Sequence, residues 1–157
     1  MNKSLLVAMA LFGLFALSSC TRGLVYEKYL EIEGNSWEYE SPVTFEVSIE
    51  ELNKEYDLYV NLRHSNDYPY SNIWLMLFSL PPNGQPTQQR LELKLAKPDG
   101  AWIGNGMGST ITHEIRVRTG MRFTEVGTYT YTIQHDMRMN QVPAVSHVGI
   151  RMEESAR

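Results

Sequence analysis

The amino-acid sequence predicts an all-β protein built as a single antiparallel β-sandwich, of either jelly-roll or immunoglobulin-like topology. Apolar and polar residues alternate along most of the chain from residue 43 onwards, which is typical of strands with one buried and one solvated face. Turn motifs separate these runs at intervals that suit seven to nine short strands. No internal repeat and no second domain is visible in the sequence, so one sandwich accounts for the chain.

The individual strands are predicted from this alternation. The run 43–49 places four apolar residues on one face and polar residues on the other. The same pattern marks further strands at 58–63, 90–96, 128–135 and 148–152. In the turn 97–100, Pro98 presets φ and Gly100 accepts a positive φ. A weak helix candidate covers residues 49–54.

The run IWLMLFSL at 73–80 differs because it is apolar on both faces. A strand covered on both sides has such a composition, and the bulky aromatic residues favour a strand over a helix. We therefore expect a central strand here, with Trp74 buried.

The first 19 residues predict a lipoprotein signal peptide. Lys3 supplies a positive charge, and residues 5–17 form an apolar stretch that is too short to span a bilayer. The sequence LSSC at 17–20 then matches the bacterial lipobox, in which the cysteine is lipidated and becomes the mature N-terminus. Cys20 is the only cysteine, so we expect a lipid anchor in the membrane and no disulfide. The predicted organisation is a signal peptide at 1–19, a lipidated stalk at 20–36 and the sandwich at 37–157.

The charge of the mature chain excludes one class of partner. Residues 20–157 carry 13 basic and 18 acidic side chains, a net charge of −5, and contain no basic block. Nucleic acid is therefore not expected as a partner.

The polar stretch RHSNDYPYSN at 63–72 connects two predicted strands and is open to two interpretations. The structural one is a corner, because proline favours extended geometry before it and short polar side chains bond nearby backbone groups. The functional one is a recognition loop, because loops on a rigid sandwich often carry binding. In that case Tyr68 and Tyr70 are exposed and, with Trp102, can stack on a sugar ring. The candidate recognition residues are Arg63, His64, Asp67, Tyr68, Tyr70, Asn72 and Trp102.

The sequence supports a metal site or a catalytic site less than it supports a recognition loop. His64, His113 and His135 share the inward phase of their strands, but no H-x-H or H-E-x-x-H motif anchors a metal. His64 with Asp67, and His113 beside Glu114, are the nearest acid–base pairs, and no nucleophile motif accompanies them. We predict no enzyme, no cofactor and no metal.

The glycine-rich stretch GNGMGST at 104–110 lacks the lysine of a phosphate-binding loop. A strand or bulge that another group approaches closely explains it better.

Five segments occur in a characteristic order: the lipobox cysteine, VYEKYLEIEGNSW, LRHSNDYPYSNIWL, LAKPDGAWIGNGMGS and GTYTYTIQHDMRMNQVPAVSHVGIRME. Together they cover nearly all of the mature chain and resemble the gliding motility lipoprotein family GldH of Bacteroidetes. The resemblance implies an envelope lipoprotein associated with gliding motility or a related surface or secretion process, without catalytic residues. Surface-exposed lipoproteins of this phylum often carry acidic residues after the cysteine. This chain has TRG at 21–23, which implies a periplasm-facing position.

The sequence and the resemblance together predict a non-enzymatic, lipid-anchored protein of the bacterial cell envelope that binds envelope protein partners. The alternative is a carbohydrate- or peptidoglycan-binding sandwich that uses the aromatic residues of the predicted recognition loop.

Overall fold

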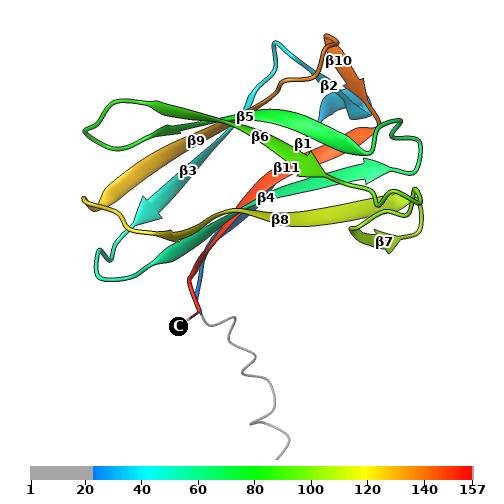
Figure 1. Ribbon diagram of the computed structural model, residues 1–157. Helices are drawn as coiled ribbons and strands as arrows, with labels where there is room; N and C mark the ends of the chain where they lie inside the picture. Colours follow the sequence, from blue (N-terminus) through cyan, green and yellow to red (C-terminus); the bar gives the residue numbers. More distant parts are fainter. Residues whose placement is uncertain (1–22, 157) are drawn as a thin grey trace, which may run out of the picture.

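The computed structural model describes residues 23–156, which form two antiparallel sheets packed face to face (Figure 1). The five-stranded sheet contains β1 (Leu24–Glu31), β11 (Val145–Glu154), β4 (Tyr56–Ser65), β8 (Thr110–Met121) and β7 (Asn105–Met107), in that order. The four-stranded sheet contains β3 (Val43–Ile49), β9 (Gly127–His135), β5 (Asn72–Leu80) and β6 (Thr87–Lys94). A short 3-10 turn, η2 (Glu33–Asn35), precedes a small ladder of β2 (Ser36–Glu38) with β10 (Gln141–Pro143).

This strand order is that of a jelly roll. When the three-residue strands are set aside, the eight long strands divide into sheets in the chain order 1-8-3-6 and 2-7-4-5. The chain crosses from β4 in one sheet to β5 in the other, forms a hairpin from β5 to β6, and then crosses back to β8. This path is that of the double Greek key of jelly rolls. The predicted all-β sandwich is therefore confirmed, and of the two predicted topologies the structure has the jelly roll. Among residues 23–156, no helix is long and apolar enough to cross a membrane.

The core lies between the two sheets and follows the predicted alternation. In β3 every second residue from Val43 to Ile49 is buried, while the residues between them are exposed. Apolar side chains from β4, β5, β9 and β11 meet these residues from the other strands. Side chains of two packed sheets interdigitate in this way across about 10 Å.

The N-terminal segment differs from the predicted stalk. Residues 24–31 form β1, which pairs with β11 from Leu24 to Glu31, and Trp37 of β2 is fully buried. Residues 24–36 therefore belong to the sandwich, and a stalk over 20–36 is wrong for this part. The signal peptide at 1–19 and Cys20 lie outside the described residues. The helix candidate at 49–54 is also wrong, because β3 ends at Ile49 and bends lead from there into β4.

The double-sided covering predicted for β5 is wrong as well. Its inward residues are buried, but Trp74, Met76 and Phe78 face outwards and are only half-buried. The Arg90 guanidinium lies 4.0 Å from the centre of the Trp74 ring and forms an ion pair with Asp136. The outer aromatic face is therefore covered by a cationic side chain instead of a third layer.

A buried carboxylate, Asp57, ties the last residues of the chain to the five-stranded sheet. It is 4 % exposed and accepts hydrogen bonds from four groups: Arg116 Nη1 at 3.1 Å, Thr119 Oγ1 at 3.0 Å, the Gly120 amide at 3.0 Å and Ser155 Oγ at 2.5 Å. Burial alone raises the pKa of this carboxyl, but the four hydrogen bonds outweigh burial and lower the pKa from 3.8 to about 2. Asp57 is therefore charged at neutral pH and holds β8 and the C-terminal segment together.

Replacing Asp57 with asparagine removes the charge but keeps the shape of the side chain. We expect Asp57→Asn to lower the free energy of unfolding by about 3 kcal/mol, because the donors lose a charged acceptor and Arg116 loses its ion partner. Urea denaturation followed by tryptophan fluorescence measures this change. The matched control is Asp67→Asn in an exposed turn, for which we expect a change within about 0.5 kcal/mol. Equal effects of the two substitutions would contradict this account of Asp57.

Candidate functional site

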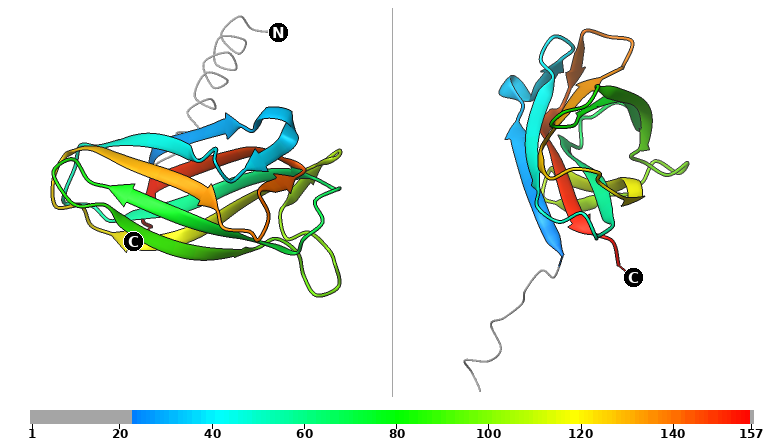
Figure 2. Two further views of the ribbon diagram at one scale, coloured as in Figure 1. Left: turned by 90° about the horizontal axis from the view of Figure 1, so that it is seen from above. Right: turned by 90° about the vertical axis from the view of Figure 1, so that its left-hand side faces the viewer.

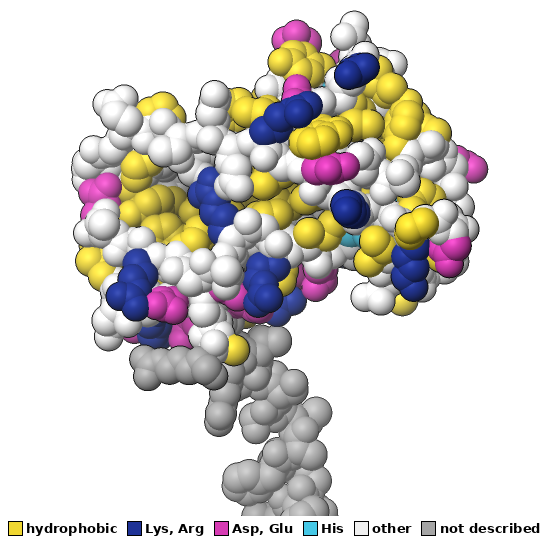
Figure 3. Space-filling view, viewed as in Figure 1, with side chains coloured by type: hydrophobic (Ala, Val, Ile, Leu, Met, Phe, Trp, Pro, Cys, Tyr) yellow, Lys and Arg dark blue, Asp and Glu magenta, His cyan; other side chains and the backbone are white. Residues whose placement is uncertain are grey.

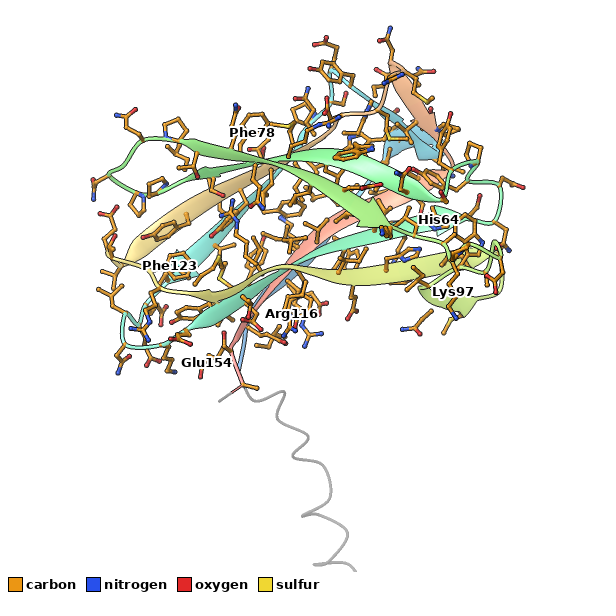
Figure 4. All side chains as sticks on the ribbon, viewed as in Figure 1. His64, Phe78, Lys97, Arg116, Phe123 and Glu154 are labelled. Carbon is orange, nitrogen blue, oxygen red and sulfur yellow. The ribbon has the colours of Figure 1, made fainter. Side chains whose placement is uncertain are left out.

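The predicted recognition residues lie at the end of the sandwich where β4 passes into β5. Figure 4 shows His64 near this end, with Phe123 towards the opposite end of the strands. Three aromatic rings pack on His64 and a fourth, Tyr70, packs on Tyr68, and we call the five residues together the end cluster. Its members are His64, Tyr68, Tyr70, Trp102 and His113.

Local hydrogen bonds position the loop that supplies the tyrosines. The Tyr68 amide donates to Ser65 O at 3.1 Å, and the Asp67 amide donates to Ser65 Oγ at 3.3 Å. Ser71 O accepts the amides of Leu95 and Ala96, which docks the loop against the end of β6. These bonds realise the structural corner that the turn residues predict.

Trp102 reaches the end cluster from a tight hairpin. Ala96 and Trp102 form an isolated antiparallel bridge, and Asp99 Oδ1 accepts the Ala101 amide at 3.0 Å. Gly100 has a φ of +87°, as the predicted turn requires. The Trp102 ring then packs edge-on against His64, with ring centres 4.5 Å apart.

The two histidines of the end cluster are buried and hydrogen-bonded to each other. His64 is 0 % and His113 is 2 % exposed, and their Nε2 atoms lie 2.9 Å apart. His64 Nδ1 lies 2.8 Å from Ser65 O, which can only accept a hydrogen bond, so Nδ1 is the protonated nitrogen of a neutral His64 and donates to it. His64 Nε2 is then an acceptor, and His113 Nε2–H donates to it. One neutral tautomer of each ring satisfies the pair.

This arrangement disfavours protonation. Burial lowers the pKa of His64, and burial together with the neighbouring His64 lowers the pKa of His113 from 6.5 to about 4. The pair is therefore neutral at pH 7 and serves as a structural contact between β4 and β8.

The structure corrects the predicted exposure of Tyr68. Tyr68 is 3 % exposed, and its hydroxyl donates to Asn72 O at 2.9 Å. Tyr70 is half-buried and donates to Met139 Sδ at 3.2 Å, and Trp102 is also half-buried. The ring of Tyr68 packs on His64 and Tyr70, so it cannot stack on a sugar as the sequence-based alternative requires.

The remaining candidates point away from the end cluster. Arg63 lies on the outer face of the five-stranded sheet, with its guanidinium 4.1 Å from the centre of the Tyr29 ring. Asp67 is exposed, and Asn72 Nδ2 donates to Glu92 Oε1 at 2.7 Å on the outer face of the other sheet. The seven predicted residues are therefore distributed over the end cluster, the exposed loop and the outer faces of the two sheets. Whether any of them recognises a partner stays a prediction.

The other histidine and acid candidates do not meet. His135 is fully buried against Trp37 and Tyr39, far along the chain from the pair, and Glu114 lies 3.4 Å from Arg151 on the outer face. Among the described residues, no group of three or more histidine, cysteine, aspartate or glutamate side chains is placed to hold a metal. Sequence reasoning missed the contact between His64 and His113, although their shared inward phase was a signal for it.

Gly104 shows why the glycine-rich stretch has its composition. A Cβ at Gly104 would lie 2.5 Å from Thr112 O and 2.8 Å from two atoms of the His113 ring. The predicted close approach of another group is confirmed here, because only hydrogen fits between this backbone and the buried histidine.

The histidine pair predicts a loss of stability in mild acid. Between pH 6.5 and about 4 the unfolded chain binds a proton at His113 that the folded chain excludes, so the free energy of unfolding is highest above pH 6.5 and falls as the pH decreases. We expect a slope of about 1 kcal/mol per pH unit, measured by urea denaturation from pH 7 to 4.5. His113→Gln should reduce this slope. His147→Gln, on the outer face, should leave it unchanged, and an unaltered slope in the His113 variant would refute the assignment.

The close packing at Gly104 gives a second prediction. Gly104→Ala should lower the free energy of unfolding by about 2 kcal/mol, because backbone and a buried ring must move. Gly106→Ala is the matched control, since its Cβ would meet only the tip of Ile111 at 3.3 Å. Thermal or urea unfolding of both variants distinguishes the two sites. A loss at Gly106 as large as that at Gly104 would contradict the prediction.

Comparison with known proteins agrees with the resemblance. A family model described as "GldH lipoprotein" matches residues 24–152. The "Gliding motility lipoprotein GldH homolog" of Christiangramia forsetii is 33 % identical, with 99 % of each chain covered. The "Gliding motility lipoprotein GldH" of Flavobacterium johnsoniae is 31 % identical, with 98 % of this chain and 96 % of the relative covered. No solved structure matches significantly. The chain belongs to the GldH lipoprotein family.

Proposed function

We propose that this protein is a non-enzymatic, lipid-anchored binding component of an envelope apparatus for gliding motility or a related surface or secretion process. The observation that carries the proposal is its similarity, over nearly its full length, to relatives named for gliding motility. The structural use of the candidate catalytic side chains supports a non-enzymatic role, since His64 pairs with His113 and His135 packs among aromatic rings.

The position of Gly23, the first described residue, supports a sandwich that lies close to the membrane surface. Gly23 O accepts the Glu154 amide at 2.7 Å, which fixes the first described residue to the end of β11. Gly23 is three positions after Cys20, so the Cα atoms of the two residues are at most about 11 Å apart. A lipid on Cys20 therefore keeps the end of the sandwich that carries Gly23 and Glu154 within this distance of the bilayer surface.

We also propose that the protein faces the periplasm. The residues that follow Cys20 are Thr21, Arg22 and Gly23, none of which is acidic. Protease treatment of intact cells tests this proposal. The protein should survive in intact cells and be degraded once the outer membrane is permeabilised, whereas degradation in intact cells would place it on the cell surface.

Deletion of the gene tests the proposed role. We expect impaired spreading of colonies, or altered secretion or surface protein composition, and recovery when the wild-type gene is restored. Chemical crosslinking in the native envelope should also join the protein to a defined neighbour. A deletion without effect on motility, secretion and surface composition would refute the role.

Cys20→Ser provides a direct test of the anchor. The variant should lose incorporation of radiolabelled palmitate and move from the membrane fraction to the soluble fraction. The reason is that the acyl chains on Cys20 provide the affinity of the protein for the bilayer. Thr21→Ser, which lies after Cys20 and outside the lipobox, should retain both properties. Unchanged labelling of the Cys20 variant would contradict the lipobox assignment.

A further inference from the structure

One side of the sandwich is left open by the strand order. The sheets end in β6 and in β8 on this side, and β7 covers β8 only from Thr110 to Thr112. On the opposite side the end strands β1 and β3 are in contact. Figure 2 shows this asymmetry in its end-on view, where the sheets lie closer at β1 and β3 than at β6 and the end of β8. The strand edges of β6 and of residues 113–121 in β8 therefore have no neighbouring strand within the described chain.

The first half of β6 lacks a covering layer on either face. Leu91 and Leu93 face inwards and are buried, whereas Gln89, in the same inward phase, is exposed. All four residues from Thr87 to Arg90 are exposed. Since inward-facing residues of a closed sandwich are buried, the interior is accessible beside this half of β6.

Apolar side chains form the floor of this open side. Phe123 packs on Tyr56 and Tyr129, with ring centres 5.2 Å and 4.6 Å apart, yet remains half-buried. Val117 and Met121 of β8 are likewise only partly covered. In Figure 3, which is viewed onto this side, apolar side chains lie uncovered between the two sheets. We call this surface, from Thr87–Arg90 across to Ile115–Phe123, the open side.

Arg118 crosses the open side without a carboxylate partner. Its Nε donates to Gln89 Oε1 at 3.0 Å and its Nη1 donates to the inward Ser79 Oγ at 3.2 Å, so the guanidinium lies between the two sheets. Among the described ion pairs, Arg90, Arg116 and Arg122 each have an acidic partner and Arg118 has none. A half-buried guanidinium that contacts neutral oxygens is a binding site for a carboxylate.

The distribution of charged residues along the chain also favours an acidic partner. Residues 87–122 carry six basic and three acidic side chains, whereas the remaining described residues carry five basic and fifteen acidic ones. The two segments of the open side itself, 87–90 and 115–123, carry four arginines and no acidic residue, so this side is basic although the protein as a whole is acidic. Two copies meeting through their open sides would bring like charges together, which disfavours a symmetric dimer there.

The two free edges differ in their suitability for a new strand. The register between β5 and β6 is unbroken from Asn72 with Lys94 to Ser79 with Thr87, so β6 presents a regular edge. The pairing of β4 with β8 shifts register twice near Leu58, which bends β8. Bulges of this kind protect an edge from pairing, so β6 is the edge that can accept a strand.

We propose that the open side binds an extended, acidic segment of a partner protein, which adds to the edge of β6 as a further strand. Its backbone bonds β6, its inward apolar side chains cover Phe123 and Val117, and an inward carboxylate pairs with Arg118. Backbone bonds provide affinity in such strand addition, and alternate side chains provide specificity. This inference deepens the proposed partner-binding role and rests on it only for the existence of a protein partner.

The experiment uses the full chain in detergent and a panel of fluorescent ten-residue peptides. Alternate positions of each peptide carry valine or isoleucine and one glutamate, so that these side chains share one face of a strand, and the positions between them carry threonine. We expect binding by fluorescence anisotropy, with slower hydrogen–deuterium exchange in residues 87–94. Peptides with lysine in place of glutamate, or with a central proline, should not bind. Arg118→Gln should weaken binding at least about tenfold, because it removes the ion pair. Arg138→Gln, an exposed arginine of the loop before β10, should leave binding unchanged.

Several outcomes would overturn the proposal. These are the absence of binding across the acidic panel, protection confined to residues 113–121, and equal affinity for acidic and basic peptides. Unchanged binding by a folded Arg118→Gln variant, whose unfolding curve is measured in parallel, would also overturn it. So would a stable dimer at micromolar concentration in which β6 is already protected. None of these results depends on the lipid anchor or on motility, so failure here leaves the proposed envelope role to its own tests.

Discussion

The insertion of the last strand between the first strand and β4 is the constraint on which the rest of the fold depends. β11 pairs along one edge with β1 and along the other with β4, so the five-stranded sheet forms only when the two ends of the chain meet. Gly149 marks how tight this junction is, because a Cβ there would lie 2.5 Å from Lys28 O and 3.1 Å from the Tyr29 ring. The same pairing places Gly23 beside Glu154 and thereby determines which end of the sandwich the chain enters from Cys20, the residue that we propose to be lipidated.

Two polar contacts stabilise opposite ends of β4 by opposite electrostatic means. At one end Asp57 stays charged because four donors surround it, and at the other the pair of His64 and His113 stays neutral because burial removes water without adding a counter-charge. Both join β4 to β8 within the sheet. The other side of β8, beyond residue 112, has no strand neighbour in the described chain, and this makes it the boundary of the open side.

The alternation that marks half-buried strands was sufficient to predict β3, β4, β6, β9 and β11 to within a few residues, since burial of one face leaves a period of two in the sequence. The same reasoning misread β5, because Trp74 is covered by the stem and guanidinium of Arg90 and not by a third layer. It also missed β1, whose residues at 24–31 are half-buried or exposed and therefore show little alternation. Tyr68 was misplaced for a related reason. A tyrosine beside a proline in a polar loop looks exposed, and only the folding of that loop over His64 buries it.

The sequence by itself determined the class of fold and the family, because the periodicity of strands and the order of local segments can be read from neighbouring residues. The lipoprotein leader with Cys20 stays a prediction from the same kind of local pattern. The jelly-roll order, the neutral histidine pair and the open side with Arg118 between the sheets were decided only by the tertiary structure. Each depends on residues far apart in the chain, such as His64 with His113 or Gln89 with Arg118, and the distance between such residues follows from strand pairing and sheet packing that no local pattern encodes.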